Sequence, residues 1–429
     1  MKKTIQMTDT YLAQNLLNKT FFFSRSYYIL TGIALLSIPF TPLFYFFISP
    51  LLLILWIIEG KWKDKWSQIK ESKTLIIILS FMLFWLINLI GVFYSSYFER
   101  GLIRTYDKLP FLIYPLVFFT INKSCFSKDK LNRLFKGFIC TTTIMLLISW
   151  GKAFVHHLKT GKTDYYYYIK FSELFGHPAY YALIVCIAFC ILFYFFNNST
   201  KSNKWILLIL MLFFALSIYF LQSRSGIMAF IIIVLFSIFY YLHTHNKPYW
   251  HGITGILAVS LFVVLIVKLF PSRIGYYVGE VNSEQFHTKN LVGIRSEIWE
   301  ITFRLGMENK MIGIGSGYNS NSYLTEDELD IINEHQLFIN AHNQFLQTFL
   351  EHGILGFCII AFLFIYSFYY AIKTKNYLLL MLLVGFFINI FFESMLERGH
   401  GIFTFCLFYS LFLAKNDIFE PDDTVISRE

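Results

Sequence analysis

Two arginines in the second half of the chain lie where a cation is normally unfavourable. Arg224 is in "LQSRSGIMAF" and Arg295 is in "VGIRSEIWEITFRLGMEN", each close to the expected start of a helix. A cation at a helix N-terminus costs about 0.3–1 kcal/mol because that end of the helix is itself positive. A bound anion reverses the sign, since the N–H groups, the dipole and the guanidinium then attract the same oxygens. The alternative is snorkelling, in which an arginine at the end of a membrane span reaches for water.

A histidine opens the stretch "HNQFLQTFLEHGILG", where a polar segment runs into an apolar helix. The helix dipole disfavours an imidazolium at His342, so we expect a neutral ring that can accept a proton. Considered alone, a histidine at a membrane interface is more often structural than catalytic. Asn343 either caps the helix or orients a ligand. His352 lies about 80° away around the helix and is interpreted as structural.

A polar cluster occurs in "ESMLERGHG", residues 393–401, at the expected outer end of the last two spans. Its charged and titratable members are Glu393, Glu397, Arg398 and His400. They either shape the site or hold the helices together through ion pairs. Glu393 and Arg398 are kept as supporting site candidates.

Other patterns carry less chemistry. "GIGSG" lacks the Gly-Lys-Ser/Thr continuation of a phosphate loop and is interpreted as a flexible turn. His335 and His342 have no carboxylate at metal-ligand spacing, and no HExxH motif occurs, so we expect neither a metal nor a cofactor. Four further polar residues precede the fourth apolar run, and any of the basic ones could attract a phosphate: Arg100, Arg104, Asp107 and Lys108.

The composition indicates that membrane helices position these residues. The chain is 56% hydrophobic and 15% charged, with 50 Phe and 28 Tyr. Apolar runs of about twenty residues are typical of membrane spans, and lipid requires that such spans be helical. The sequence therefore predicts an all-α integral membrane protein, a single domain over residues 1–429. The predicted spans number twelve: 27–39, 41–58, 74–94, 109–121, 134–155, 179–196, 204–221, 225–242, 251–270, 343–371, 377–392 and 399–414.

The distribution of Lys and Arg predicts the orientation. If the N-terminus is inside, the tails and even-numbered loops carry most of the basic residues, as the positive-inside rule requires. Both termini then face the cytoplasm, and the net charge of +9 reflects this bias rather than nucleic-acid binding. The six cysteines fall in spans or a cytoplasmic loop, so no disulfide framework is expected.

The largest outer loop, residues 271–342 between the ninth and tenth spans, is expected to form a periplasmic cap. Within it one apolar stripe predicts an amphipathic helix, with Arg295 in its first turn. The stripe consists of Ile294, Ile298, Ile301 and Leu305.

These motifs together resemble the O-antigen ligase family. The resemblance rests on "HNQFLQTFLEHGILG", which has a His-Asn pair followed by Gly353 and Gly356, on "SRSG" before a span, and on "GIRSEIW" in the outer loop. The twelve spans with the largest loop between the ninth and tenth also fit. The related region covers residues 205–356. The resemblance implies a GT-C-like integral membrane fold.

The resemblance also implies an activity: a metal-independent, inverting glycosyltransferase of the bacterial inner membrane. Its donor would be a glycan on undecaprenyl diphosphate, and its acceptor a hydroxyl of lipid A–core or another surface glycan. Arg224 and Arg295 would hold the diphosphate, and His342 would activate the acceptor hydroxyl at the periplasmic face. Such an enzyme needs fixed positive charge for the leaving group and one base on the opposite side of the sugar.

Four other functions stay open, one of them a non-catalytic scaffold of the cell envelope, since no single residue forces catalysis. Repeat-unit polymerases and protein O-oligosaccharyltransferases share the outer-loop pattern, so the acceptor, the glycan and the oligomeric state do not follow from the sequence. A lipid-glycan transporter is the rival of a different class. Transport sites lie near the bilayer midplane with intramembrane charges and repeat symmetry, whereas the polar residues here gather at one face.

Overall fold

The computed structural model describes residues 2–40, 43–71, 75–121, 123–248, 250, 252, 257, 291–317 and 340–419. Within these ranges the chain is helical and contains no strand. The predicted ninth span, 251–270, is outside the described residues except for isolated positions, and so is most of the predicted cap. The other predicted spans each contain a helix: α1 (Lys2–Ser37), α2 (Leu43–Glu59), α4 (Leu75–Val92), α6 (Pro110–Phe118), α7 (Lys128–Thr160), α9 (Pro178–Asn197), α10 (Lys201–Leu221), α11 (Arg224–Thr244), α16 (Gln344–Lys373), α17 (Tyr377–Phe392) and α18 (Gly399–Phe419).

Shorter helices lie between these. They are α3 (Trp62–Glu71), α5 (Phe98–Asp107), α8 (Tyr168–Ser172) and α14 (Leu291–Glu308), with 3-10 turns at Lys123–Phe126, Asp164–Tyr166 and Met395–Glu397. Helix α5 was not predicted from the sequence. Its polar and apolar residues alternate at helical spacing, so it is too polar to be counted among the spans.

Several helices are long and apolar enough to cross a bilayer. Among the described residues six meet this description: Leu75–Val92, Lys128–Thr160, Pro178–Asn197, Asn203–Leu221, Arg224–Thr244 and Gln344–Lys373. Shorter apolar helices occur at Phe46–Glu59, Tyr377–Phe392 and Gly399–Ala414. The chain is therefore a multi-pass membrane protein, and the number twelve stays a prediction.

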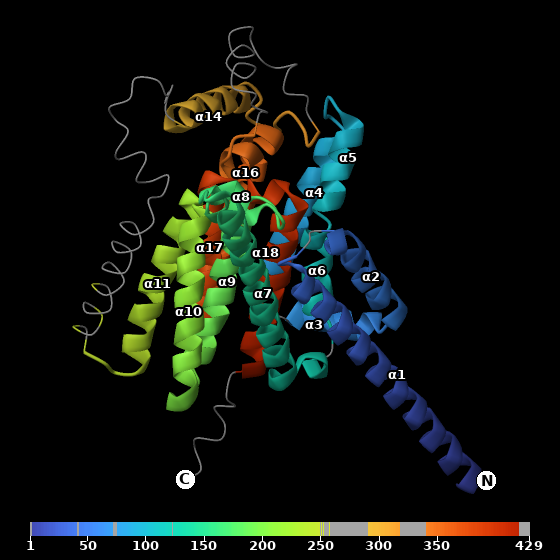
Figure 1. Cartoon of the computed structure of the whole chain (residues 1–429). Helices are drawn as coiled ribbons and strands as arrows, with labels where there is room; N and C mark the ends of the chain where they lie inside the picture. Colours follow the sequence, from blue (N-terminus) through green and yellow to red (C-terminus); the bar gives the residue numbers. More distant parts are fainter. Residues whose placement is uncertain are drawn as a thin grey trace, which may run out of the picture.

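Helix α9 lies inside the bundle, packed against α7, α10, α11 and α17. Of its apolar window, 78% is buried, against 28% for α10. The side chains of α10 that remain exposed include Ile206 and Ile209, as expected for a helix that faces lipid on one side. Figure 1 shows α14 lying across one end of this bundle, above the beginning of α16, while α1 begins at the opposite end.

Helix α16 is broken at Gly353, which explains why the tenth predicted span was too long. Gly353 has φ 62° and ψ −158°, a backbone conformation that is accessible essentially to glycine alone. The segment before the break is a short buried helix that begins at Gln344, and the membrane-spanning part follows the break. The two parts therefore point in different directions, and the first carries the site residues at its start.

The glycine-rich segment that follows α14 packs into this break. Ile314 N donates to Leu350 O and Gly315 N donates to Glu351 O, while Ile354 N donates to Lys310 O. A Cβ on Gly313, whose φ is +73°, would lie 2.3 Å from the backbone carbon of Glu351. The interpretation of "GIGSG" as a flexible turn is therefore wrong for residues 313–317, because close backbone contact holds the segment in place.

Candidate active site

Helix α14 is held over the start of α16 by the apolar stripe that the sequence predicted. Ile298, Ile301 and Leu305 are buried, and Trp299 Nε1 donates to Ala341 O at 2.7 Å. The helix begins at Leu291, so Arg295 lies in the second turn rather than the first. The helix dipole acts within the first turn, so it contributes less to an anion at Arg295 than we expected.

Arg224 and Arg295 line one cavity of about 270 Å³. Arg224 is the first residue of α11, capped by Ser223, whose side chain accepts from Gly226 N. A Cβ on Gly226 would lie 2.4 Å from Ala182 Cβ, so only glycine lets α11 pack this closely on α9. The rest of the cavity wall consists of Ser225, Met228, Ser296, Trp299 and Phe392. Two guanidinium groups thus share a space whose other wall is largely apolar.

Glu393 joins Arg295 to His342. Its Oε1 accepts from Arg295 Nη2 at 2.9 Å, and its Oε2 lies 2.8 Å from His342 Nδ1. Burial by itself would raise the pKa of the Glu393 carboxyl. The hydrogen bond with His342 and the charge of Arg295 outweigh burial, so the pKa is lowered. The ionised carboxylate can accept a hydrogen bond from Nδ1–H of His342, and in that tautomer the lone pair of the ring is on Nε2.

His342 is held in an unusual backbone conformation. Its φ is +44°, in the left-handed region that few residues other than glycine adopt. Its amide N donates to Asn340 Oδ1 at 3.0 Å. His342 does not itself line the 270 Å³ cavity; its connection to the cavity runs through Glu393. Backbone strain of this kind, at a cost of about 1–3 kcal/mol, tends to occur where a side chain must point in one direction.

Asn343 is a helix cap. Its Oδ1 accepts from Phe345 N at 2.9 Å and from Leu346 N at 3.1 Å, and the residue is 5% exposed. Of the two roles considered for Asn343, the structure shows the capping one. Arg398 is exposed, and it is close enough to His177 for its charge to affect the pKa of that ring.

His177 is a site neighbour that the sequence reasoning missed. It caps α9, with Nδ1 accepting from Ala179 N at 3.3 Å. The residue is exposed overall, but partial loss of solvent around the ring lowers the pKa of the imidazole; the charge of Glu393 opposes this, and those of Arg295 and Arg398 add to it. A neutral ring agrees with a capping Nδ1 that accepts. The available signal was the His-Pro pair at the start of a span on the same face.

Two of the basic residues before the fourth span, Arg104 and Lys108, turn inward instead of toward a substrate, whereas Arg100 is exposed. Lys108 is 1% exposed, and its Nζ lies 2.8 Å from Glu397 Oε2 and 2.7 Å from Asn88 Oδ1. Arg104 Nη1 lies 2.7 Å from Glu351 Oε1, whose carboxylate is fully buried. The expectation that Lys108 could attract a phosphate is wrong, because two buried carboxylates, Glu351 and Glu397, need its charge.

His352 belongs to the same buried cluster. It is 1% exposed, and its Nε2 lies 2.9 Å from Asn88 Oδ1. Gln344 extends the cluster to the start of α16, with Nε2 donating to Glu397 Oε1 at 2.8 Å. The polar motif at 393–401 is thus divided: Glu397 joins this structural cluster, whereas Glu393 faces the two candidate site residues. In the part of the chain that the structure describes, no group of three or more His, Cys, Asp or Glu could hold a metal ion.

The described residues define a multi-pass, all-helical membrane protein with a charged site at one end of its bundle. Residues 208–361 match the family model described as O-antigen ligase, and no curated protein matches the chain. This match confirms the resemblance drawn from the motifs. The matched region contains Arg224, Arg295 and His342. The match supports a ligase- or polymerase-type activity in general.

Proposed function

We propose that the protein transfers a glycan from undecaprenyl diphosphate to an acceptor hydroxyl at the periplasmic face of the bacterial inner membrane. The observation that carries the proposal is the chain of contacts from cavity to histidine: Arg224 and Arg295 line one cavity, Glu393 pairs with Arg295, and His342 contacts Glu393. The match of residues 208–361 to the O-antigen ligase family model supports the general class of reaction. Lipid A–core or another surface glycan is the acceptor that we consider first.

Each group has one role in the proposed reaction. His342 Nε2 takes the proton of the acceptor hydroxyl, whose oxygen attacks the anomeric carbon as the bond from that carbon to the phosphate oxygen breaks. The sugar is inverted, and undecaprenyl diphosphate leaves with its charge held by Arg224 and Arg295. Glu393 is a positioning residue. Its carboxylate fixes the tautomer of His342 and stabilises the imidazolium that forms.

The apolar wall of the cavity suits the lipid part of the donor. Met228, Trp299 and Phe392 line the cavity together with the two arginines, and Met228 is on a helix long enough to cross the bilayer. A polyprenyl chain could therefore stay in lipid while its diphosphate reaches the arginines. A polyprenyl diphosphate is already a good leaving group, so the proposal needs no metal, and we expect EDTA to leave turnover unchanged.

Reconstitution of the full-length protein in liposomes tests the proposal. The liposomes carry a defined undecaprenyl-diphosphate-linked glycan, and candidate acceptors are supplied on the outside. We expect one glycan per acceptor; a ladder of lengths would indicate a repeat-unit polymerase, and a glycosylated protein an O-oligosaccharyltransferase. If the intact lipid-linked glycan moved across the bilayer and no glycan were transferred, the proposed enzymatic function would be wrong and the protein would be a transporter.

A further inference from the structure

A second site lies at the end of the bundle opposite the candidate active site. Two helices run from one site to the other: α9 starts after His177 and ends at Asn197, and α17 ends before Glu393 and starts at Tyr377. At this far end two adjoining cavities of about 250 and 650 Å³ share Lys128, Tyr194 and Asn198 in their walls. No step of the proposed reaction uses them.

The walls of these cavities carry positive charge. Lys375 lines the smaller cavity, Lys136 the larger one and Lys128 both, and no Asp or Glu is among the described residues that line either. Asp129 follows Lys128 in α7, but it is exposed and belongs to neither wall. Two adjoining cavities with three lysines between them and no carboxylate among their described lining residues favour an anionic occupant.

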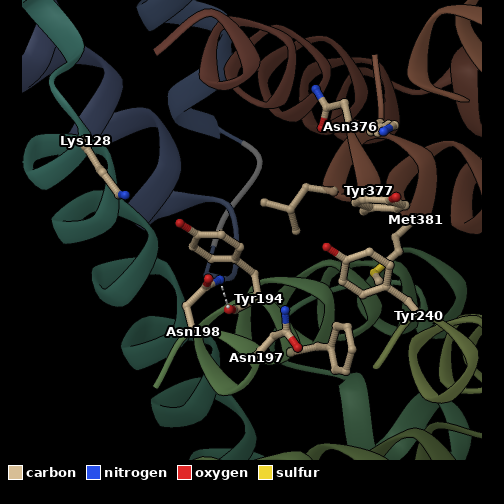
Figure 2. A pocket seen from close by; sticks show the side chains of 11 residues that line it. Lys128, Tyr194, Asn197, Asn198, Tyr240, Asn376, Tyr377 and Met381 are labelled. Atoms are coloured by element: carbon tan, nitrogen blue, oxygen red, sulfur yellow. Dashed lines mark hydrogen bonds between the residues drawn. The ribbon is translucent and has the colours of Figure 1, made fainter. Parts of the chain in front are cut away.

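Amide and hydroxyl groups make up the rest of the polar lining of the two cavities. Figure 2 shows Lys128 reaching from α7 on one side of the smaller cavity, with Tyr240 and Tyr377 on the other. The Oδ1 atoms of Asn197 in the smaller cavity and Asn132 in the larger are buried and have no hydrogen-bond partner among the described residues. Buried polar atoms are normally paired, so these two amides have capacity for the hydroxyl groups of a ligand.

The larger cavity has an apolar wall that continues into the lipid-facing surface. Ile139, Leu207 and Leu210 line it, together with Ile206, which is 63% exposed. The neighbouring Trp205 is 70% exposed, as is typical of a tryptophan at the membrane–water interface. Polar groups at the end of the bundle and aliphatic groups along its side suit an amphiphile better than a free anion.

We propose that these cavities bind one anionic glycerophospholipid from the leaflet at this end of the bundle. The phosphate would lie among Lys128, Lys136 and Lys375, the headgroup hydroxyls would meet the asparagines, and an acyl chain would follow α10. Basic pockets between membrane helices at the cytoplasmic surface are suited to acidic headgroups. The bound lipid would tie the start of α7 to the α16–α17 turn.

Native mass spectrometry of the full-length protein tests this. The protein is purified from mixed micelles containing equal amounts of phosphatidylglycerol and phosphatidylcholine. We expect one phosphatidylglycerol to be retained in preference. Lys128→Gln and Lys375→Gln should each weaken retention about five-fold, the effect of one lysine near an anionic headgroup.

Two matched controls isolate the site. Lys373 is in the same segment as Lys375 and is exposed but lines neither cavity, so Lys373→Gln should retain the lipid as wild type does. Ile206 and Ile209 are 63% and 64% exposed, yet only Ile206 lines the larger cavity. Ile206→Ser should therefore weaken retention, and Ile209→Ser should not. Lipid-free unfolding temperatures equal to wild type show that each variant folds.

Three results would overturn the proposal. One is equal retention of the two lipids, and another is the same loss for Lys373→Gln as for Lys375→Gln. The third is full displacement of the lipid by equimolar glycerol 3-phosphate, which would identify a site for a soluble anion. None of these measurements uses glycan transfer, so the outcome is independent of the proposed function.

Discussion

At the scale of single residues, Glu393 is the contact that connects the candidate site. Its two oxygens serve different partners, Arg295 at 2.9 Å and His342 at 2.8 Å. One carboxylate thus contacts both Arg295, which is proposed to bind the leaving diphosphate, and His342, which is proposed to activate the acceptor hydroxyl. Substitutions at these three positions should consequently have separable effects on donor binding and on transfer.

His342→Ala should reduce transfer by about 10²–10⁴-fold, the range for loss of a positioned general base, while donor affinity stays near wild type. Glu393→Gln should lower the transfer rate less and alter its pH profile, because the histidine remains but its tautomer is no longer held. Transfer rate and donor affinity are measured separately in purified protein. His157→Ala, a partly buried histidine of α7, is the control. Normal transfer by His342→Ala would exclude the proposed base.

Arg295→Lys should lower transfer by about 10²–10³-fold, nearly as much as Arg295→Ala. Lysine keeps the charge but loses the planar, two-pronged donor geometry that matches a phosphate. Arg304 is on the same helix and pairs with Glu308 at the surface, so Arg304→Lys should leave the rate unchanged. If Arg295→Lys retained the wild-type rate, the residue would act only as a point charge.

The lowered pKa of Glu393 makes its contribution to stability depend on pH. The ordinary value is 4.5 and the folded value is lower, so the stabilisation is present above pH 4.5 and is lost as pH falls through the folded value. Unfolding temperatures are measured from pH 7 to pH 3.5. At neutral pH the unfolding temperature of Glu393→Gln should be below that of wild type, and the difference should disappear below pH 4.5. Glu308→Gln, in an exposed pair, should show little difference at any pH. If the difference in unfolding temperature between Glu393→Gln and wild type grew in acid, the lowered pKa of Glu393 would be contradicted.

At the scale of elements, the break in α16 and the segment docked into it hold α14 in place. Gly313→Ala would place a Cβ 2.3 Å from the backbone of Glu351 at a φ of +73°. Gly161→Ala tests the backbone cost alone, because Gly161 has φ +70° and no atom within 4 Å of the added Cβ.

We therefore expect Gly161→Ala to lower the free energy of unfolding by about 1–2 kcal/mol, the cost of the left-handed conformation. Gly313→Ala should cost more and should also reduce transfer, since displacement of this segment moves α14 and Arg295. Denaturant unfolding and transfer assays measure the two effects. If Gly161→Ala and Gly313→Ala lowered the free energy of unfolding equally, the segment around Gly313 would accommodate the added Cβ without further loss of stability.

At the scale of the whole molecule, the two ends of the bundle differ in chemistry. The candidate active site is at the end that carries α14, and the lysine-lined cavities are at the other. The positive-inside rule assigns the lysine-rich end to the cytoplasm. A reporter fused after Glu429 should therefore read as cytoplasmic, and one inserted after Thr163, in the turn that follows α7, as periplasmic. The opposite pair of readings would invert the topology and remove the candidate site from the periplasm.

The sequence by itself determined the membrane class, most helix positions and the resemblance to the O-antigen ligase family. Long apolar runs and the stripe of Ile298, Ile301 and Leu305 are local patterns, and they report directly on the solvent around each segment. The motifs around Arg224, Arg295 and His342 are equally local, so they could be recognised without coordinates. That Arg295 and His342 share one carboxylate could not be recognised in this way, because Glu393 is 98 residues from Arg295 and 51 from His342.

Only the tertiary structure decided which polar residues face the site and which support the fold. Glu393 and Glu397 are one helical turn apart in sequence, yet the first joins His342 and the second neutralises buried Lys108. The break at Gly353 likewise depends on the segment that packs against it. The physical reason is the same in both cases. A charged or strained group is stabilised by whatever lies within a few ångströms of it, and in this protein those neighbours come from helices far apart along the chain.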